Sequence, residues 1–352
     1  MQKEFGTLPG GESVTIYTIT HGKLIAHITN LGATLQALYV PDREGNLSDV
    51  VLGFDRPEDY IRSGAFLGAT VGRNANRVGK ARFPLNGEEI CLGRNEGENN
   101  LHSGPDFYKD RLWAVESRTD SRICFRLDSP HGDQGFPGNA KIWVEYALED
   151  GNTLAIRYRG ICDKDTVFNL TNHSYFNLAG HDCPEKAMEQ ELSMPARFFT
   201  VADGAAIPTG ENRNVAGSPM DFRASKALSR DIGENYEPLK LQGGYDHNFE
   251  VFCNPCATLF DPSSGRAMAV STDCPGIQVY TANFTDEIGK NGAVYPPRCA
   301  VALETQFYPD SVNHPHWPQP ITKAGETYQS ETRYHFFTMD KKAVPTPENH
   351  TI

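Results

Sequence analysis

The sequence predicts an all-β fold, a large antiparallel β-sandwich or closed barrel with few short helices. Apolar residues alternate with polar ones at a period of two in several segments, which is the pattern of a strand with one buried face. The chain holds 32 glycines and 23 prolines in 352 residues, and these residues favour turns between short elements. Because long antiparallel sheets must protect their edges, a sandwich or barrel is favoured over an open sheet.

In the first half of the chain, strands are expected at residues 14–19, 24–29 and 35–40, and a short helix at 56–61. The alternation is clearest at 123–127, where Ile123, Phe125 and Leu127 alternate with polar or small residues. This segment is therefore expected to bury one face only.

In the second half, strands at 142–148 and 154–158 flank the turn-forming run 149–152, which predicts an antiparallel hairpin. A short helix is expected at 225–232, and strands at 276–284 and 300–306.

No internal repeat, low-complexity tract or linker rich in Pro, Gly or Ser divides the chain, so a single domain over residues 1–352 is expected. The tail at 341–352 has two prolines and few apolar residues and is expected to be loosely held.

The formal net charge of -12 argues against nucleic acid as a partner, because binding a phosphate backbone draws on clustered Lys and Arg. No segment reaches the roughly 20 apolar residues of a membrane helix, and the first residues lack the pattern of a secretory signal. A cytoplasmic protein with no membrane partner is expected. The eight cysteines are scattered and are expected to be reduced thiols. Cys253 and Cys256 have ligand-like spacing, but no second pair follows, so no metal site is expected.

Five dense polar segments lie inside or beside strand-like runs, at residues 72–77, 100–104, 171–178, 244–247 and 303–306. Taken singly, each has an ordinary structural explanation. Arg77 could be a surface charge, His102 and Asp246 could be turn residues, His173 could satisfy backbone groups, and Glu304 could face solvent.

Together the candidate residues of these segments are two histidines, two carboxylates and an arginine, without a nucleophile elbow or metal-ligand spacing. That set suits proton transfer on a neutral, polyhydroxylated substrate. A glycosidase would also offer paired carboxylates, but histidine is the more prominent partner here.

In their order and spacing, these segments closely resemble the aldose 1-epimerase (galactose mutarotase) family. The resemblance extends through residues 30–33, 132–139 and 309–315, and it implies that family's β-supersandwich fold. It also implies an isomerase, a mutarotase of hexose and galactose metabolism that interconverts the α and β anomers of free hexoses such as D-galactose and D-glucose. No cofactor is implied, and the partner is a small aldohexose bound by a monomer or homodimer.

Residue by residue, the resemblance implies that Glu304 is the general base, His173 the general acid and His102 a second histidine near the ring oxygen. The sugar hydroxyls would be held by Asn76, Arg77, Asp246 and Gln278. One departure is Ser103, where the family usually has glycine, which leaves the loop geometry beside His102 open.

The implied chemistry is ring opening by an acid and a base on different sides of C1, rotation about the C1–C2 bond, and reclosure on the other face. Three alternatives compete with it: an epimerase of sugar phosphates, a non-catalytic sugar-binding protein, and a β-sandwich domain of a polysaccharide-processing enzyme. The first would need a cluster of Arg or Lys for the phosphate, and the second would be expected to lack Glu304 or His173. The third would normally accompany a separate catalytic domain.

Overall fold

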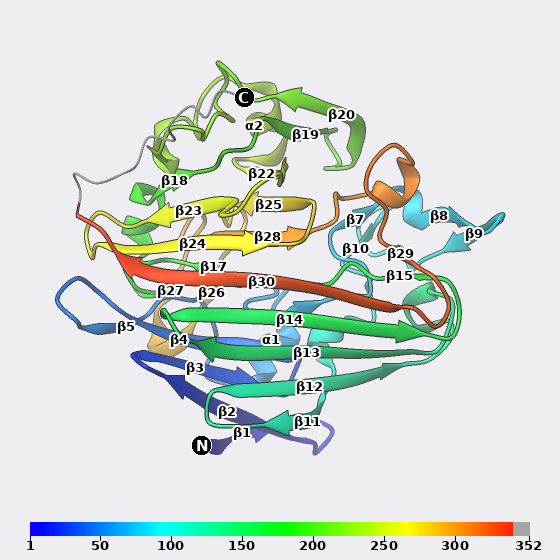
Figure 1. Ribbon diagram of the computed structural model, residues 1–352, viewed down its shortest axis with the longest axis horizontal. Helices are drawn as coiled ribbons and strands as arrows, with labels where there is room; N and C mark the ends of the chain where they lie inside the picture. The colour runs from blue at the N-terminus through cyan, green and yellow to red at the C-terminus, as the bar shows by residue number, and fades with distance from the viewer. Residues whose placement is uncertain (341–352) are drawn as a thin grey trace.

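The computed structural model describes residues 1–340 and is built mainly from antiparallel strands (Figure 1). Its largest sheet has nine strands. In spatial order these are β11 (Ala114–Arg118), β12 (Arg122–Ser129), β13 (Ala140–Glu149), β14 (Thr153–Cys162), β30 (Thr327–Thr338), β24 (Arg266–Thr272), β23 (Ala257–Phe260), β18 (Glu191–Ser193) and β21 (Lys226–Ala227). The predicted hairpin is confirmed, because β13 and β14 pair in register from Ala140 with Cys162 to Glu149 with Thr153.

Two smaller sheets complete the architecture. The five-stranded sheet runs β1 (Gln2–Thr7), β2 (Ser13–His21), β3 (Leu24–Thr29), β4 (Thr34–Pro41) and β5 (Leu47–Asp49). The six-stranded sheet runs β17 (Tyr175–Phe176), β28 (Val301–Gln306), β25 (Gly276–Tyr280), β22 (Asp246–Glu250), β19 (Phe198–Ala202) and β20 (Pro208–Asn214). The all-β prediction is confirmed.

Residues 1–340 also form five short two-stranded ribbons and two α-helices. The ribbons pair β6 (Thr70–Val71) with β16 (Thr171–Asn172), β7 (Arg77–Val78) with β10 (Asn100–Leu101), β8 (Arg82–Leu85) with β9 (Glu88–Cys91), β15 (Thr166–Val167) with β29 (Ile321–Thr322), and β26 (Glu287–Ile288) with β27 (Val294–Tyr295). The helices are α1 (Pro57–Arg62), where a helix was predicted, and α2 (Glu237–Gln242), which was not predicted.

The apolar faces of the three sheets meet in one core. Ile142, Val144 and Tyr146 of β13 belong to the same buried cluster as Ile28 of β3 and Leu303 of β28, and each is at most 1% exposed. The nine-stranded sheet therefore packs against both smaller sheets. Its opposite face is charged, because the alternation turns polar side chains away from the core.

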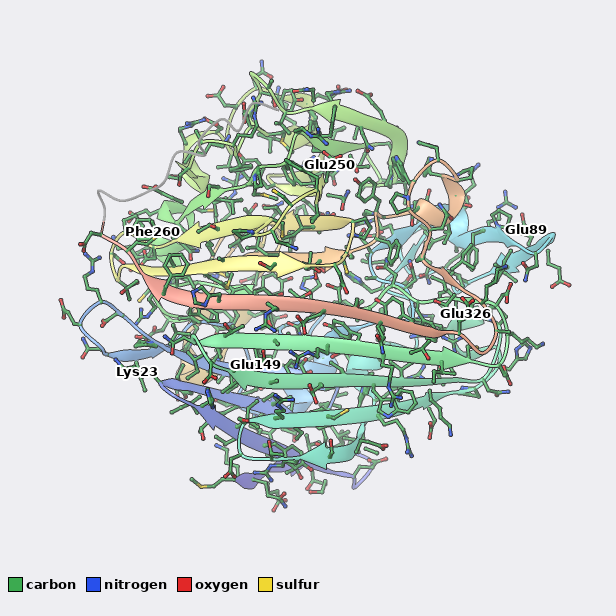
Figure 2. All side chains as sticks on the ribbon, in the orientation of Figure 1. Lys23, Glu89, Glu149, Glu250, Phe260 and Glu326 are labelled. Atoms are coloured by element: carbon green, nitrogen blue, oxygen red, sulfur yellow. The ribbon has the colours of Figure 1, made fainter. Side chains whose placement is uncertain are left out.

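That charged face carries an ion-pair network. Arg157 of β14 donates to Glu145 and Glu149 of β13 at 3.1 and 2.7 Å, and it also pairs with Glu331 of β30. Figure 2 shows Glu149 beside the turn that joins these two strands. These cross-strand contacts confirm the period-two interpretation of 154–158, in which Leu154 and Ile156 are buried on the other face.

The predicted helix at 225–232 is wrong. Residues 226–227 form β21, which pairs with β18, and a 3-10 turn follows at Leu228–Arg230. The side chain of Lys226 is drawn inward, where its Nζ donates to Asp231 at 2.7 Å. The backbone N–H of Leu228 donates to the carbonyl of Gln190 at 3.0 Å. Sheet-edge pairing thus overrides the local propensity.

The predicted strand 276–284 ends early, at Tyr280. Ala282 has a φ of 50°, in the left-handed region, and the Thr281 hydroxyl donates to the Asn283 side chain at 2.7 Å. The chain therefore turns out of the sheet, and residues 281–287 lie beside the cavity described below. The predicted loose tail, 341–352, lies outside the described residues. Within residues 1–340, no helix is long and apolar enough to cross a membrane.

Candidate active site

The polar segments singled out in the sequence converge on one cavity of about 430 Å³, a size suited to a small molecule. It is lined by six of the seven predicted site residues: Asn76, Arg77, His102, His173, Asp246 and Glu304. Strands β28 and β22 of the six-stranded sheet supply Glu304 and Asp246, and loops and short ribbons supply the rest. Residues up to 228 positions apart in sequence thus line the same cavity.

Glu304 is buried although it lies in an apolar strand. Every residue of β28 is buried, so both faces of this strand are covered and alternation does not turn Glu304 to solvent. Its neighbour across the sheet is Gln278 of β25. Burial, with a further contribution from the charge of Asp246, holds the pKa of the Glu304 carboxyl well above its ordinary value.

His173 lies between β16 and β17, where backbone hydrogen bonds fix it. Its N–H donates to the carbonyl of Ala69 at 2.9 Å, and its carbonyl accepts from Gly68 at 3.0 Å. The ring packs against Tyr175, with centroids 4.9 Å apart. Burial lowers the pKa of His173 to about 4, so its imidazole is neutral around pH 7 when the site is empty.

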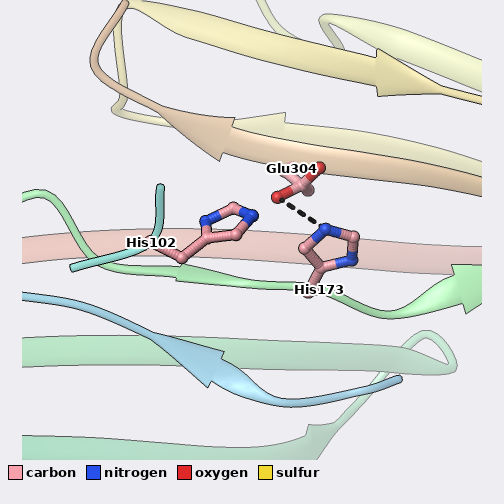
Figure 3. A group of neighbouring side chains, drawn as sticks. All are labelled: His102, His173 and Glu304. Carbon is pink, nitrogen blue, oxygen red and sulfur yellow. Dashed lines mark ion pairs between the residues drawn. The ribbon is translucent and has the colours of Figure 1, made fainter. Parts of the chain in front are cut away.

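The two proposed proton-transfer groups face each other (Figure 3). Nε2 of His173 lies 3.6 Å from Oε2 of Glu304, longer than an ordinary hydrogen bond. Within residues 1–340, Oε2 of Glu304 and Nδ1 of His173 are buried without a hydrogen-bond partner. Buried polar atoms are nearly always paired, so an unpaired oxygen at the cavity indicates a place for a polar ligand.

His102 has a tautomer set by the backbone. The backbone N–H of Asn76 donates to Nδ1 of the His102 ring at 3.1 Å. The backbone N–H of His102 donates to the carbonyl of Asn76 at 3.0 Å. Because Nδ1 accepts, the proton of the neutral ring is on Nε2. Burial, with the nearby His173 and Arg77, keeps the pKa of His102 well below its ordinary value. This histidine is thus a neutral N–H donor toward the cavity.

Ser103 fits the loop beside His102 despite a φ of 62°. Its hydroxyl accepts from the Asn74 N–H at 2.8 Å and donates to the Asn74 carbonyl at 2.9 Å. These two bonds offset the strain of a left-handed conformation in a non-glycine residue. The serine therefore stabilises the loop geometry that a glycine would reach without strain.

Arg77 and Asp246 form a charged wall of the cavity. The Arg77 guanidinium donates to both carboxylate oxygens of Glu96, at 2.7 and 2.8 Å, and its Nη1 lies 3.9 Å from Asp246 Oδ2. This bidentate pair fixes the plane of the guanidinium. Gln278 does not line the cavity. Instead, its Nε2 donates a hydrogen bond to Asp246 Oδ1 at 2.6 Å. In this structure Gln278 positions Asp246.

Several lining residues were not singled out in the sequence. Glu96 sits in a glycine-rich polar run that has the composition of an ordinary surface turn, so nothing in the sequence marked it. Phe66 stacks near both histidines, with ring centroids 4.8 Å from His102 and 6.0 Å from His173. Phe284 lines the mouth. Apolar walls of this kind exclude water and strengthen hydrogen bonds inside a site.

The cluster of His102, His173 and Glu304 also has the residue types of a metal site, with one potential ligand atom from each within 4.8 Å of the others. The donor set does not fit a metal well. A metal ligand nitrogen must be unprotonated, but the Asn76 N–H already occupies Nδ1 of His102 and leaves the proton on Nε2. The arrangement suits proton transfer and hydrogen bonding to a neutral ligand better.

Comparison with known proteins identifies the family. A family model described as aldose 1-epimerase matches residues 15–335. The galactose mutarotase of Bos taurus is 40% identical over 339 residues, which cover 94% of this chain and 97% of the bovine protein. The aldose 1-epimerase of Haemophilus influenzae is 39% identical over 311 residues, covering 87% and 90%.

Among solved structures, an aldose epimerase homologue from C. elegans superimposes with a TM-score of 0.86 at 32% identity, over 92% of this chain and 99% of that one. The family model spans most of the chain, and the relatives match nearly end to end. The chain therefore belongs to the aldose 1-epimerase family, a family of isomerases.

Proposed function

We propose that this enzyme interconverts the α and β anomers of free aldohexoses such as D-glucose and D-galactose, with Glu304 as general base and His173 as general acid. The observation that carries the proposal is the pair itself. A carboxyl and an imidazole lie 3.6 Å apart, each with a buried, unpaired polar atom, in a cavity of about 430 Å³. The galactose mutarotases among the relatives support galactose as one substrate.

Ring opening needs two proton transfers at different oxygens. Glu304 removes the proton of the C1 hydroxyl while the bond between C1 and the ring oxygen breaks, and His173 donates a proton to that ring oxygen. The products are an aldehyde at C1 and a hydroxyl at C5. After C1 turns by about half a rotation around the C1–C2 bond, the same groups act in reverse and close the opposite anomer.

The Glu304–His173 pair shares one proton in this scheme. Burial raises the pKa of Glu304 and lowers that of His173, so in the empty site the proton rests on the carboxyl. A bound sugar contacts both groups, offering a hydroxyl donor to Glu304 and an ether acceptor to His173. These hydrogen bonds favour carboxylate and imidazolium, which are the forms that start the reaction.

The other residues hold the sugar while C1 turns. His102 donates its Nε2–H to an oxygen near the ring ether, consistent with its fixed tautomer. Asn76, Arg77 and Asp246 bind hydroxyls at the far side of the ring through charge-assisted or neutral hydrogen bonds. Gln278 does not contact the sugar in this scheme; it fixes the position of the Asp246 carboxylate by a hydrogen bond.

The cavity favours a neutral sugar over a sugar phosphate. Arg77 is the only Lys or Arg among the described residues that line it, and Glu96 already engages that guanidinium. Four carboxyl groups besides Glu96 surround the space: Asp246, Asp286, Glu287 and Glu304. A phosphate dianion there would meet repulsion without a free cation.

The pH dependence of the rate tests both the function and the proton count. We expect polarimetry on freshly dissolved α-glucose to show enzymatic anomerisation whose kcat/KM falls on the acid side near pH 4, not near pH 6.5, where an ordinary histidine titrates. Activity should fall only when the pair binds a second proton, near the His173 pKa of about 4, or loses its last one above the raised pKa of Glu304. An acid limb near pH 6.5, after subtraction of the uncatalysed rate, would contradict this account.

We also propose a reducing, cytoplasmic setting and a role in free-hexose metabolism. All eight cysteines are unpaired, and Cys91 and Cys253 are exposed. Exposed free thiols persist where glutathione and thioredoxin keep them reduced.

A further inference from the structure

Arg77 and Asp246 carry opposite charges and lie next to each other in the catalytic cavity, but they do not form a hydrogen bond. Nη1 of Arg77 is 3.9 Å from Oδ2 of Asp246, beyond the roughly 2.7–2.9 Å of a charge-assisted hydrogen bond. Their side chains are only 15% and 14% exposed. Because partly buried opposite charges attract each other strongly at this distance, other contacts must hold the two groups apart.

Glu96 holds the arginine from one side. Nε and Nη2 of Arg77 donate to its two carboxylate oxygens at 2.7 and 2.8 Å, which leaves Nη1 as the nitrogen nearest Asp246. The loop that carries Glu96 is itself fixed. The side chain of the preceding Asn95 bonds both backbone groups of Leu101 in β10, and Leu101 pairs with Arg77 in β7. The carboxylate and the guanidinium are therefore held in register by the same ribbon.

Gln278 holds the aspartate from the other side. Its Nε2 donates to Oδ1 of Asp246 at 2.6 Å. Gln278 lies in β25, the strand that pairs with β22, which carries Asp246. The two charged side chains are thus braced by different elements, and Nη1 and Oδ2 are the atoms that remain on either side of the gap.

This gap matches the hydrogen-bonding capacity of one sugar hydroxyl. A guanidinium only donates and a carboxylate only accepts, whereas a hydroxyl oxygen accepts and donates at once. Two atoms 3.9 Å apart leave room for a hydroxyl oxygen about 2.8 Å from each. A direct bond between Arg77 and Asp246 would use up both groups and close the gap.

We propose that Glu96 is a positioning residue that keeps the Arg77–Asp246 pair open, so that one hydroxyl of the hexose binds between them. The inference rests on the proposed function, in which these two residues hold the sugar while C1 turns. Without the carboxylate at position 96, the guanidinium closes onto Asp246 and competes with the sugar. Glu96 thereby makes the enzyme specific for hexoses that carry this hydroxyl.

The test compares Glu96→Gln with the wild type on galactose and its monodeoxy derivatives at C2, C3, C4 and C6. Magnetisation exchange between the α and β anomeric protons gives each anomerisation rate at equilibrium. We expect kcat/KM of the wild type to be at least about tenfold lower for one deoxy sugar than for galactose, because the missing hydroxyl leaves two charged groups unpaired. Comparing this ratio between the two enzymes cancels the intrinsic reactivity of the sugar.

In Glu96→Gln the ratio should fall at least about fivefold. KM for galactose should rise about tenfold and kcat should stay within about threefold, because the hydroxyl is held in ground and transition state alike. The side chain of Glu96 is 35% exposed, so the variant is expected to fold, and thermal unfolding checks this. A crystal structure of the variant without sugar should show Nη1 of Arg77 bonded to Asp246.

Glu98→Gln is the matched control. Glu98 lies in the same loop, is exposed and does not line the catalytic cavity. The change removes one negative charge but no partner of Arg77, so this variant should match the wild type on every sugar.

The proposal is wrong if Glu96→Gln keeps the wild-type KM and discrimination, or if it weakens all five sugars equally, as a purely structural loss would do. A wild type that does not discriminate against any deoxy sugar, or a variant whose gap stays open, would also overturn it. A wild type that anomerises none of the sugars would instead refute the function on which the inference rests.

Discussion

Glu304→Gln is expected to lower kcat for anomerisation by about 10²–10⁴-fold, the usual worth of one general base. The amide has the shape of the carboxyl but cannot take the C1 hydroxyl proton. Stability should hold, because burial already favours the neutral carboxyl of Glu304, which is 2% exposed, and its Oε2 has no hydrogen-bond partner within residues 1–340. Polarimetry on α-glucose gives the rate, and thermal unfolding checks the fold.

Glu287→Gln is the matched control for that experiment. Glu287 also lines the cavity, but it is held by the Ser63 hydroxyl at 2.6 Å and has no part in the proton transfers. We expect it to retain most of the wild-type rate. Retention of full turnover by Glu304→Gln would remove Glu304 from the role of base.

His173→Asn is expected to reduce kcat by a similar factor of about 10²–10⁴, because no group remains to protonate the ring oxygen. The acid limb of the pH profile, set by the His173 pKa of about 4, should also change. A loss that came only from packing would leave that limb in place. The change in the profile therefore separates proton transfer from a structural role.

His181→Asn is the control for histidine removal. His181 is buried at 8% exposure and bonds the Tyr295 hydroxyl at 2.9 Å, but it lies outside the cavity lining. The His181→Asn variant is expected to have a lower free energy of unfolding but an unchanged kcat per folded molecule. If His173→Asn behaved in the same way, His173 would be a packing residue rather than the acid.

Strands with one buried face were predictable from the sequence because apolar and polar residues alternate in them with a period of two. The segments 123–127 and 142–148 lie in β12 and β13, and the alternating Ile123, Phe125, Ile142 and Val144 are buried. The predicted helix at 225–232 was wrong because its conformation depends on pairing with β18, more than thirty residues away. The early end of β25 depends on side-chain bonds of the turn at 281–283. Local patterns do not contain these long-range or side-chain effects.

The candidate site was predictable where several polar segments match the motifs of a known family. It was less predictable where only the three-dimensional structure determines the position of a side chain. Six of the seven predicted residues line the cavity, but the place of Gln278 behind Asp246 could not be read from alternation. The burial of Glu304 needed the knowledge that β28 is covered on both faces. Glu96 and Phe284 carried no signal in the sequence, because a charged turn and a single phenylalanine are common on ordinary surfaces.

A crystal structure of the Glu304→Gln variant with bound galactose would test the central claim most directly. The account predicts the C1 hydroxyl beside the side chain of residue 304, and the ring oxygen within about 3.2 Å of His173 Nε2. The remaining hydroxyls should point to Arg77 and Asp246. A sugar bound in the reverse orientation, with C1 toward Arg77, or bound outside this cavity, would contradict it.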